Sequence, residues 1–180
     1  MLDRIALVGM LLATLAGCAA APASGPARLG LKLSPAGLGE SISVQQHLTV
    51  ERGGRTDVLD AALEVDDKKL ALVGLAFGQR VLTLDFDGME LKTWRHVMLP
   101  SQVRGEDVLE DLQLALWPAA EVARALPSGW RIEEQGLQRR IYFDNALVVS
   151  IDYSTLPRWQ GTIRMNNLRY AYRLTIESAP

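Results

Sequence analysis

Few side chains in this 180-residue sequence combine the chemistry and the spacing of a catalytic or metal-binding site. The two histidines, His47 and His96, fall on different predicted strands, and neither has a partner at metal-ligand spacing. Asp107 and Asp111 would share a face of a helix with Glu110 beside them, an arrangement that suits general acid–base chemistry. Acidic side chains in the first turns of a helix also favour its dipole and usually face water. We prefer this second, simpler interpretation.

Other signs of catalysis or of nucleic-acid binding are weak. The sequence has neither a Gly-x-Ser-x-Gly motif nor a phosphate-binding glycine loop. Arg139 and Arg140 form a basic pair beside a strand, and such charges are usually solvated. The net charge of −2 argues against a nucleic-acid partner. We therefore expect no enzyme activity, no metal and no cofactor.

The only cysteine, Cys18, ends an apolar run near the start of the chain. The uncharged run 5–15 follows one basic residue, Arg4. It is too short to cross a bilayer as a helix but fits the apolar core of a signal peptide. A lone cysteine can form no intrachain disulfide, and a free thiol is a liability in an oxidising compartment.

The sequence Leu15-Ala16-Gly17-Cys18 resembles the lipobox of bacterial lipoproteins. The resemblance implies that Cys18 receives a diacylglyceryl group, that residues 1–17 are removed and that the new amino group is acylated. Ala19, where Asp would signal inner-membrane retention, implies the periplasmic face of the outer membrane in a Gram-negative source. The alternative is an ordinary secretory signal that contains a cysteine by chance. We expect a lipidated cysteine and flexible tether over 18–40, and one domain over 41–180.

Period-two alternation, typical of half-buried strands, dominates the rest of the chain. Short polar turns, such as 66–69 and Asp87-Gly88, separate the strands and indicate antiparallel meanders. Between two sets of strands, Val108, Leu109, Leu112 and Leu116 have helical spacing. The predicted strands span 43–50, 59–66, 70–77, 81–86 and 89–95, then 130–135, 137–143, 146–153, 161–168 and 170–177.

These elements predict an α+β fold, a large curled antiparallel sheet that forms an incomplete β-barrel. A sheet of ten strands must curl, split or close, and its concave face needs an apolar cover. One helical segment inserted mid-chain, 106–126, is the available cover, and it would enclose an apolar cavity. The candidate cavity-lining residues are Leu112, Leu116, Trp117, Trp130, Tyr170 and Tyr172, although aromatic residues on half-buried strands are more often plain core.

The segment Gly74–Gly78 is unusual because two glycines frame the large apolar residues Leu75 and Phe77. Turns usually carry polar residues. If the glycines mark the turn, both side chains could project outward and enter a membrane. If the strand continues, both are buried.

Three stretches of the sequence resemble the lipoproteins grouped under domain of unknown function 3261. They are 111–118 (DLQLALWP), 126–130 (LPSGW) and 170–177 (YAYRLTIE). That family is similar to LolA and LolB, which receive and hand over lipoproteins in the periplasm and have an incomplete barrel with helices over a hydrophobic cavity. Its members are often encoded beside aryl-polyene synthesis genes. LolB-like proteins begin with an amphipathic helix, whereas 27–40 here contains Pro35 and several glycines.

The resemblance and the predicted cavity favour a lipoprotein that binds or transfers a lipid or a lipoprotein acyl group, and that works with other envelope transport proteins. The family context implies aryl-polyene lipid export. A structural or adaptor lipoprotein that binds another protein through a strand edge or an apolar patch is the alternative. An enzyme for lipid-linked substrates would need polar groups converging in the cavity, and the sequence offers no good set.

Overall fold

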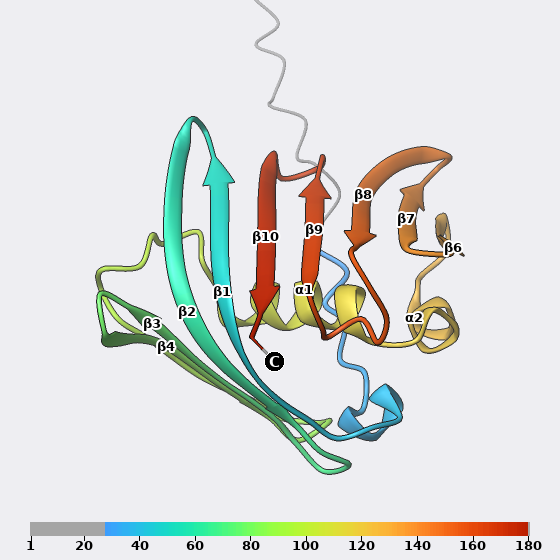
Figure 1. Cartoon of the computed structure of the whole chain (residues 1–180). Coiled ribbons are helices and arrows are strands. Elements are labelled where there is room, and N and C mark those ends of the chain that lie inside the picture. Colours follow the sequence, from blue (N-terminus) through green and yellow to red (C-terminus); the bar gives the residue numbers. More distant parts are fainter. Residues whose placement is uncertain (1–27, 180) are drawn as a thin grey trace, which may run out of the picture.

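A computed structural model describes residues 28–179 of the chain (Figure 1). Along the chain, five strands precede the helical segment and five follow it, as the alternation predicts. A 3-10 helix, η1 (Pro35–Leu38), comes first. The first five strands are β1 (Ile42–Arg52), β2 (Arg55–Val65), β3 (Leu70–Ala76), β4 (Gln79–Phe86) and β5 (Leu91–Arg95). The helices are α1 (Gly105–Leu116) and α2 (Ala119–Ala125). The last five strands are β6 (Trp130–Gln135), β7 (Gln138–Phe143), β8 (Ala146–Tyr153), β9 (Thr162–Asn167) and β10 (Tyr172–Ser178).

The strands form one open sheet in the order β5-β4-β3-β2-β1-β10-β9-β8-β7-β6, and every neighbouring pair is antiparallel. Two five-stranded meanders therefore meet where β1 pairs with β10. The chain leaves the first meander at one edge, β5, and enters the second at the other edge, β6. The helical segment between them must cross the sheet, and α1 lies behind the strands within its curve (Figure 1). This confirms the predicted fold class.

Turn residues in the predicted places set the strand register. Gly53 and Gly54 both have positive φ angles and join β1 to β2 in a tight turn that glycine accommodates readily. Oδ1 of Asp66 accepts backbone hydrogen bonds from Lys68 and Lys69 in the β2–β3 hairpin. Oδ1 of Asp87 accepts two in the same way, from Met89 and Glu90, in the β4–β5 hairpin. These Asx-type turns stabilise the hairpins that the sequence predicts.

The core lies between the concave face of the sheet and α1. Alternate residues of β1, β2 and β3 point inward and are buried. Register shifts near Gly74 and Ile141 interrupt β3–β4 and β7–β8, and irregularities of this kind increase the local bend of a sheet. Gly105 lets α1 approach β5 closely, because a Cβ atom there would lie 2.2 Å from a Thr93 methyl carbon. The sheet can therefore curve around the helix.

Residues 28–38, which we call the strap, were predicted to be part of a flexible tether, but the structure packs them against the core. Leu31, Leu33 and Leu38 are buried in the same core as α1, so this stretch belongs to the folded domain. Its leucines contribute apolar surface that a free tether would expose to water. Residues 1–27, including Cys18 and the signal peptide, lie outside the described residues. No helix within 28–179 has the length and apolar character needed to span a bilayer.

Candidate functional site

An apolar cavity, the inner pocket, lies between α1, the loop before it and the concave face of the sheet. Its volume is about 160 Å³. Strands β1, β2 and β10 contribute Gln46, Leu48, Val50, Arg52, Leu59, Ala61, Tyr172, Leu174 and Ile176. The remaining lining residues are Arg28, Leu72, Gly74, Val81, Leu82, Leu99, Gln102, Val103, Arg104, Asp107, Val108, Asp111 and Leu112. Most of this lining is aliphatic, so the pocket suits an apolar chain.

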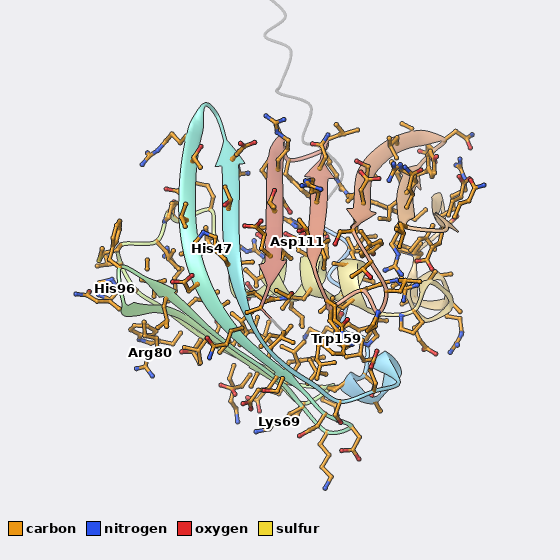
Figure 2. All side chains as sticks on the ribbon, viewed as in Figure 1. His47, Lys69, Arg80, His96, Asp111 and Trp159 are labelled. Carbon is orange, nitrogen blue, oxygen red and sulfur yellow. The ribbon has the colours of Figure 1, made fainter. Side chains whose placement is uncertain are left out.

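One end of the inner pocket carries a cluster of charged and hydrogen-bonding groups. Nη1 of Arg28 lies 3.2 Å from Oδ1 of Asp111, and its Nε lies 3.3 Å from Oδ1 of Asp107. The Tyr172 hydroxyl donates a hydrogen bond to Asp111 and accepts one of 3.1 Å from Asn167. The Arg28 guanidinium also lies 4.2 Å from the centre of the Tyr170 ring. Figure 2 shows Asp111 beside β10, the strand that provides Tyr172.

The strap is bound along α1 by polar contacts. The Gly30 N–H donates to Oε2 of Glu110 at 2.7 Å. The side-chain amide of Gln113 exchanges two hydrogen bonds with the Leu33 backbone, at 2.9 and 3.0 Å. Nε1 of Trp117 donates to the Ser34 carbonyl at 2.9 Å. The strap therefore covers the face of α1 that points away from the inner pocket's apolar lining.

This arrangement overturns the expectation that the acidic side chains of α1 face water. Glu110 is 3 % exposed and Gln113 is fully buried, while the side chains of Asp107 and Asp111 are each 14 % exposed. The strap supplies Arg28 and a backbone N–H where solvent was expected. Buried charges are retained only when they are paired or hydrogen-bonded, and these contacts meet that condition. The carboxylates serve to hold the strap to α1.

Burial raises the pKa of Asp111 to about 6, although Arg28 and Tyr172 favour its charged form. Burial also raises the pKa of Glu110. A pKa above its unfolded value means that ionisation costs folding free energy. The contribution of protonated Asp111 to folding stability is therefore fully present below about pH 4 and is lost as the pH rises through about 6.

The variant Asp111→Asn should abolish this part of the pH dependence, because asparagine stays neutral. Relative to the wild type, its free energy of unfolding should rise by up to about 3 kcal/mol between pH 4 and pH 7. Urea denaturation of both proteins across this range measures the difference. A difference that stays constant with pH, or falls, would show that Asp111 does not titrate in this way.

The structure places only part of the predicted cavity lining at the inner pocket. Leu112 and Tyr172 line it. Leu116 and Trp117 are buried but do not line the inner pocket, and Trp117 lies close to Gly37 of η1. The Trp130 ring packs at a tilt against the Phe143 ring, with ring centres 5.1 Å apart, at the β6 edge of the sheet. Tyr170 borders an adjoining open groove with Arg28 and Glu110, outside the inner pocket.

At the β3–β4 hairpin, the glycine-framed segment does form a turn. Phe77 has a φ of 52° and is 96 % exposed, with Gly78 also at positive φ. Leu75 is half-buried within β3. The turn begins after Ala76, so one of the two candidate side chains projects freely and the other stays in the sheet.

The burial of two further polar residues, Arg139 and Gln46, was not predicted from the sequence. Arg139, expected to be solvated, is fully buried, where Nη1 donates to the Leu114 carbonyl and the guanidinium pairs with Glu134. Gln46 is 4 % exposed and lines the inner pocket. Its position in the inward set of β1, between Val44 and Leu48, was the signal that could have drawn attention to it.

The histidines do not converge on a shared site. Nδ1 of His47 lies 2.8 Å from Oδ1 of Asp60 on the solvent-facing side of the sheet. His96 follows β5 at the opposite end of the hairpins from Lys69 (Figure 2). Among residues 28–179, no three histidine, cysteine, aspartate or glutamate side chains lie close enough to hold a metal ion.

The model of the family described as "Protein of unknown function (DUF3261)" matches residues 43–180, which confirms the resemblance inferred from the three sequence stretches. A search of curated proteins finds no match. A solved structure to which the chain is similar is that of a LolA superfamily protein from Nitrosomonas europaea. The sequence identity is 11 % and the TM-score 0.39, over 83 % of this chain and 90 % of the other. A likeness of this degree says nothing about a shared ligand.

Proposed function

The chain belongs to the DUF3261 family, and we propose that it is a lipid-handling lipoprotein of the bacterial envelope that is not an enzyme. The observation that carries the proposal is the inner pocket, an aliphatic cavity with charged groups gathered at one end. Binding sites for small molecules are typically concave and apolar, with a few polar groups that orient the ligand. The ligand would be an apolar chain lying between α1 and the sheet.

The size of the pocket indicates how a ligand would enter. An apolar cavity of about 150 Å³ holds a molecule the size of benzene, and ligand sites usually span roughly 300–1,000 Å³. At about 160 Å³ the inner pocket holds only part of an acyl chain. We propose that the loop 96–104, which lines it through Leu99 and Val103, moves outward as a longer chain enters.

The polar groups of the pocket support binding rather than catalysis. Asp107 and Asp111 are held by Arg28, and Asp111 also accepts from Tyr172, so these carboxylates have structural partners. Candidate ligands are the acyl chains of lipoproteins and aryl-polyene lipids, both of which an aliphatic lining suits. The adaptor alternative gains no comparable support, since an adaptor needs no internal cavity.

The lipobox-like sequence before Cys18 supports a membrane location. We propose that lipids on Cys18 hold the domain at the periplasmic face of the outer membrane, and that Phe77 provides a second contact. Phe77 is 96 % exposed at the β3–β4 turn. Val97 and Met98, which follow His96, are also exposed. The backbone N–H of His96 donates to the Val81 carbonyl near the start of β4, so this segment lies at the same end of β4 as Phe77. These three side chains give one end of the domain an apolar surface.

Filling the inner pocket should block ligand binding. Val50 is half-buried and lines the pocket, so Val50→Trp places an indole in the space of the ligand. We expect the affinity for a fluorescent fatty-acid probe to fall at least tenfold, which corresponds to about 1.4 kcal/mol. Fluorescence titration of the purified protein measures this affinity.

Thr49→Trp is the matched control, because adjacent residues of a strand point to opposite faces. This variant should bind the probe like the wild type and fold equally well. Equal losses of affinity in both variants would place the probe outside the pocket. A wild-type protein that binds no apolar probe would favour the adaptor alternative.

A further inference from the structure

Gln46 is a buried polar side chain within the aliphatic lining of the inner pocket. It is 4 % exposed, and Nε2 donates to Oγ of Ser178 at 3.2 Å. Its Oε1 is buried without a hydrogen-bond partner. The register partner of Gln46 on β2 is Ala61, which is also buried and lines the pocket. An amide in such surroundings is costly unless another group completes its hydrogen bonding.

The position of Gln46 places this amide far from the charged end of the pocket. Along β1, the inward residues run from Gln46 through Leu48 and Val50 to Arg52, and all four line the pocket. At about 3.3 Å per residue, Gln46 and Arg52 lie roughly 20 Å apart along the strand. Arg52 pairs in register with Tyr172, which belongs to the charged cluster. The pocket thus has a charged end, an aliphatic middle and a single amide at the other end.

We infer that the ligand is an extended apolar chain that carries a hydroxyl group at the end farthest from the charged cluster, where Gln46 binds it. This inference rests on the proposed function, because it assigns a chemical class to the ligand of the same pocket. The Ser178 hydroxyl can donate or accept, so the amide can present either its oxygen or its nitrogen to the pocket. A ligand hydroxyl is able to pair with both.

A charged group fits this end of the pocket poorly. The charged side chains of the lining form one cluster. Arg28 pairs with both Asp107 and Asp111, and Arg104 lies 3.8 Å from Asp107. A carboxylate next to Gln46 would be buried without a counter-ion, at high cost. An acid ligand would therefore place its carboxylate toward Arg52 and its far end at Gln46.

Palmitic acid and its ω-hydroxy derivative test the inference directly. Both are titrated against the full chain carrying Cys18→Ser, so that no anchor lipid competes, with displacement of a fluorescent probe as the readout. The wild-type pocket should bind the ω-hydroxy acid about fivefold to tenfold more tightly, the ratio expected for one buried hydrogen bond. Gln46→Leu should reverse this preference, because an aliphatic side chain leaves the hydroxyl unpaired.

Gln45→Leu is the matched control, since Gln45 is the neighbouring glutamine on the exposed face of β1. It should keep the wild-type preference. Gln46→Met is a second variant with an unbranched side chain, and circular dichroism checks that each variant is folded. Tight binding of both acids with equal affinity would overturn the role of Gln46 and leave the proposed function intact. Binding of neither acid would overturn both.

Discussion

Replacing Arg139 with methionine should destabilise the domain by about 3 kcal/mol, because the substitution breaks a buried charge pair. The Arg139 side chain is fully buried. Its Nε donates to Oε2 of Glu134 at 2.8 Å, and its Nη1 donates to the carbonyl of Leu114 in the last turn of α1. Methionine fills much of the same volume but leaves that carbonyl and one side of Glu134 without their donor. Urea denaturation measures the loss.

The adjacent Arg140 provides the control. Its side chain is 25 % exposed and pairs with Asp152, which is 46 % exposed. Partly exposed pairs of this kind contribute less than about 1 kcal/mol, so Arg140→Met should have a small effect. If the two variants lose the same stability, burial of the Arg139 pair is not what matters.

The Arg139 contact also makes the two halves of α1 differ in how firmly they are held. The C-terminal half of α1 is held by Arg139 at Leu114, by the Tyr153 hydroxyl, which donates to the Ala115 carbonyl at 2.7 Å, and by Gln113 through the strap. The N-terminal half is held by the hydrogen bond from Gly30 to Glu110 and by ion pairs of Asp107 with Arg28 and with the exposed Arg104. We therefore propose that a ligand enters beside the N-terminal half of α1 and the loop before it, where one of these ion pairs involves the exposed Arg104.

The sequence predicted the strands well because alternation and turn chemistry are local signals. Val44, Gln46 and Leu48 point inward as their spacing indicates, and Asp66 and Asp87 form the turns expected of them. The two meanders and the mid-chain helix then leave few ways to connect the sheet edges. Fold class could for this reason be inferred without knowledge of any long-range contact.

The site was less predictable because its partners are distant in the sequence. Glu110 and Gln113 look like the solvent face of an amphipathic helix until the strap, 80 residues earlier, is seen to cover them. Arg139 looks solvated until its carbonyl partner on α1, 25 residues away, is known. Polar residues of this kind reveal their burial only through tertiary contacts, which periodicity does not encode.

Replacing Cys18 with serine should transfer the protein from the membrane fraction to the soluble fraction while the domain stays folded. Several acyl chains on one residue anchor a protein durably, at about 0.8 kcal/mol for each buried methylene, and no side chain of the domain matches this. Cys18 lies outside the described residues, so the prediction rests on the sequence before it. Cell fractionation, with circular dichroism of the soluble variant, provides the measurement. A variant that stays with the membrane would rule out the lipid as the main attachment.

The same variant makes the weaker contact of Phe77 measurable. Inserting one phenylalanine into the bilayer interface contributes roughly 1.5–3 kcal/mol, so Phe77→Ser in the Cys18→Ser protein should weaken vesicle binding about tenfold or more. Met89→Ser is the control, since Met89 is 85 % exposed but lies in the β4–β5 turn, at the other end of β4. Cosedimentation with phospholipid vesicles distinguishes the two. A larger loss from Met89→Ser would indicate that the end of the domain at the β4–β5 turn faces the membrane instead.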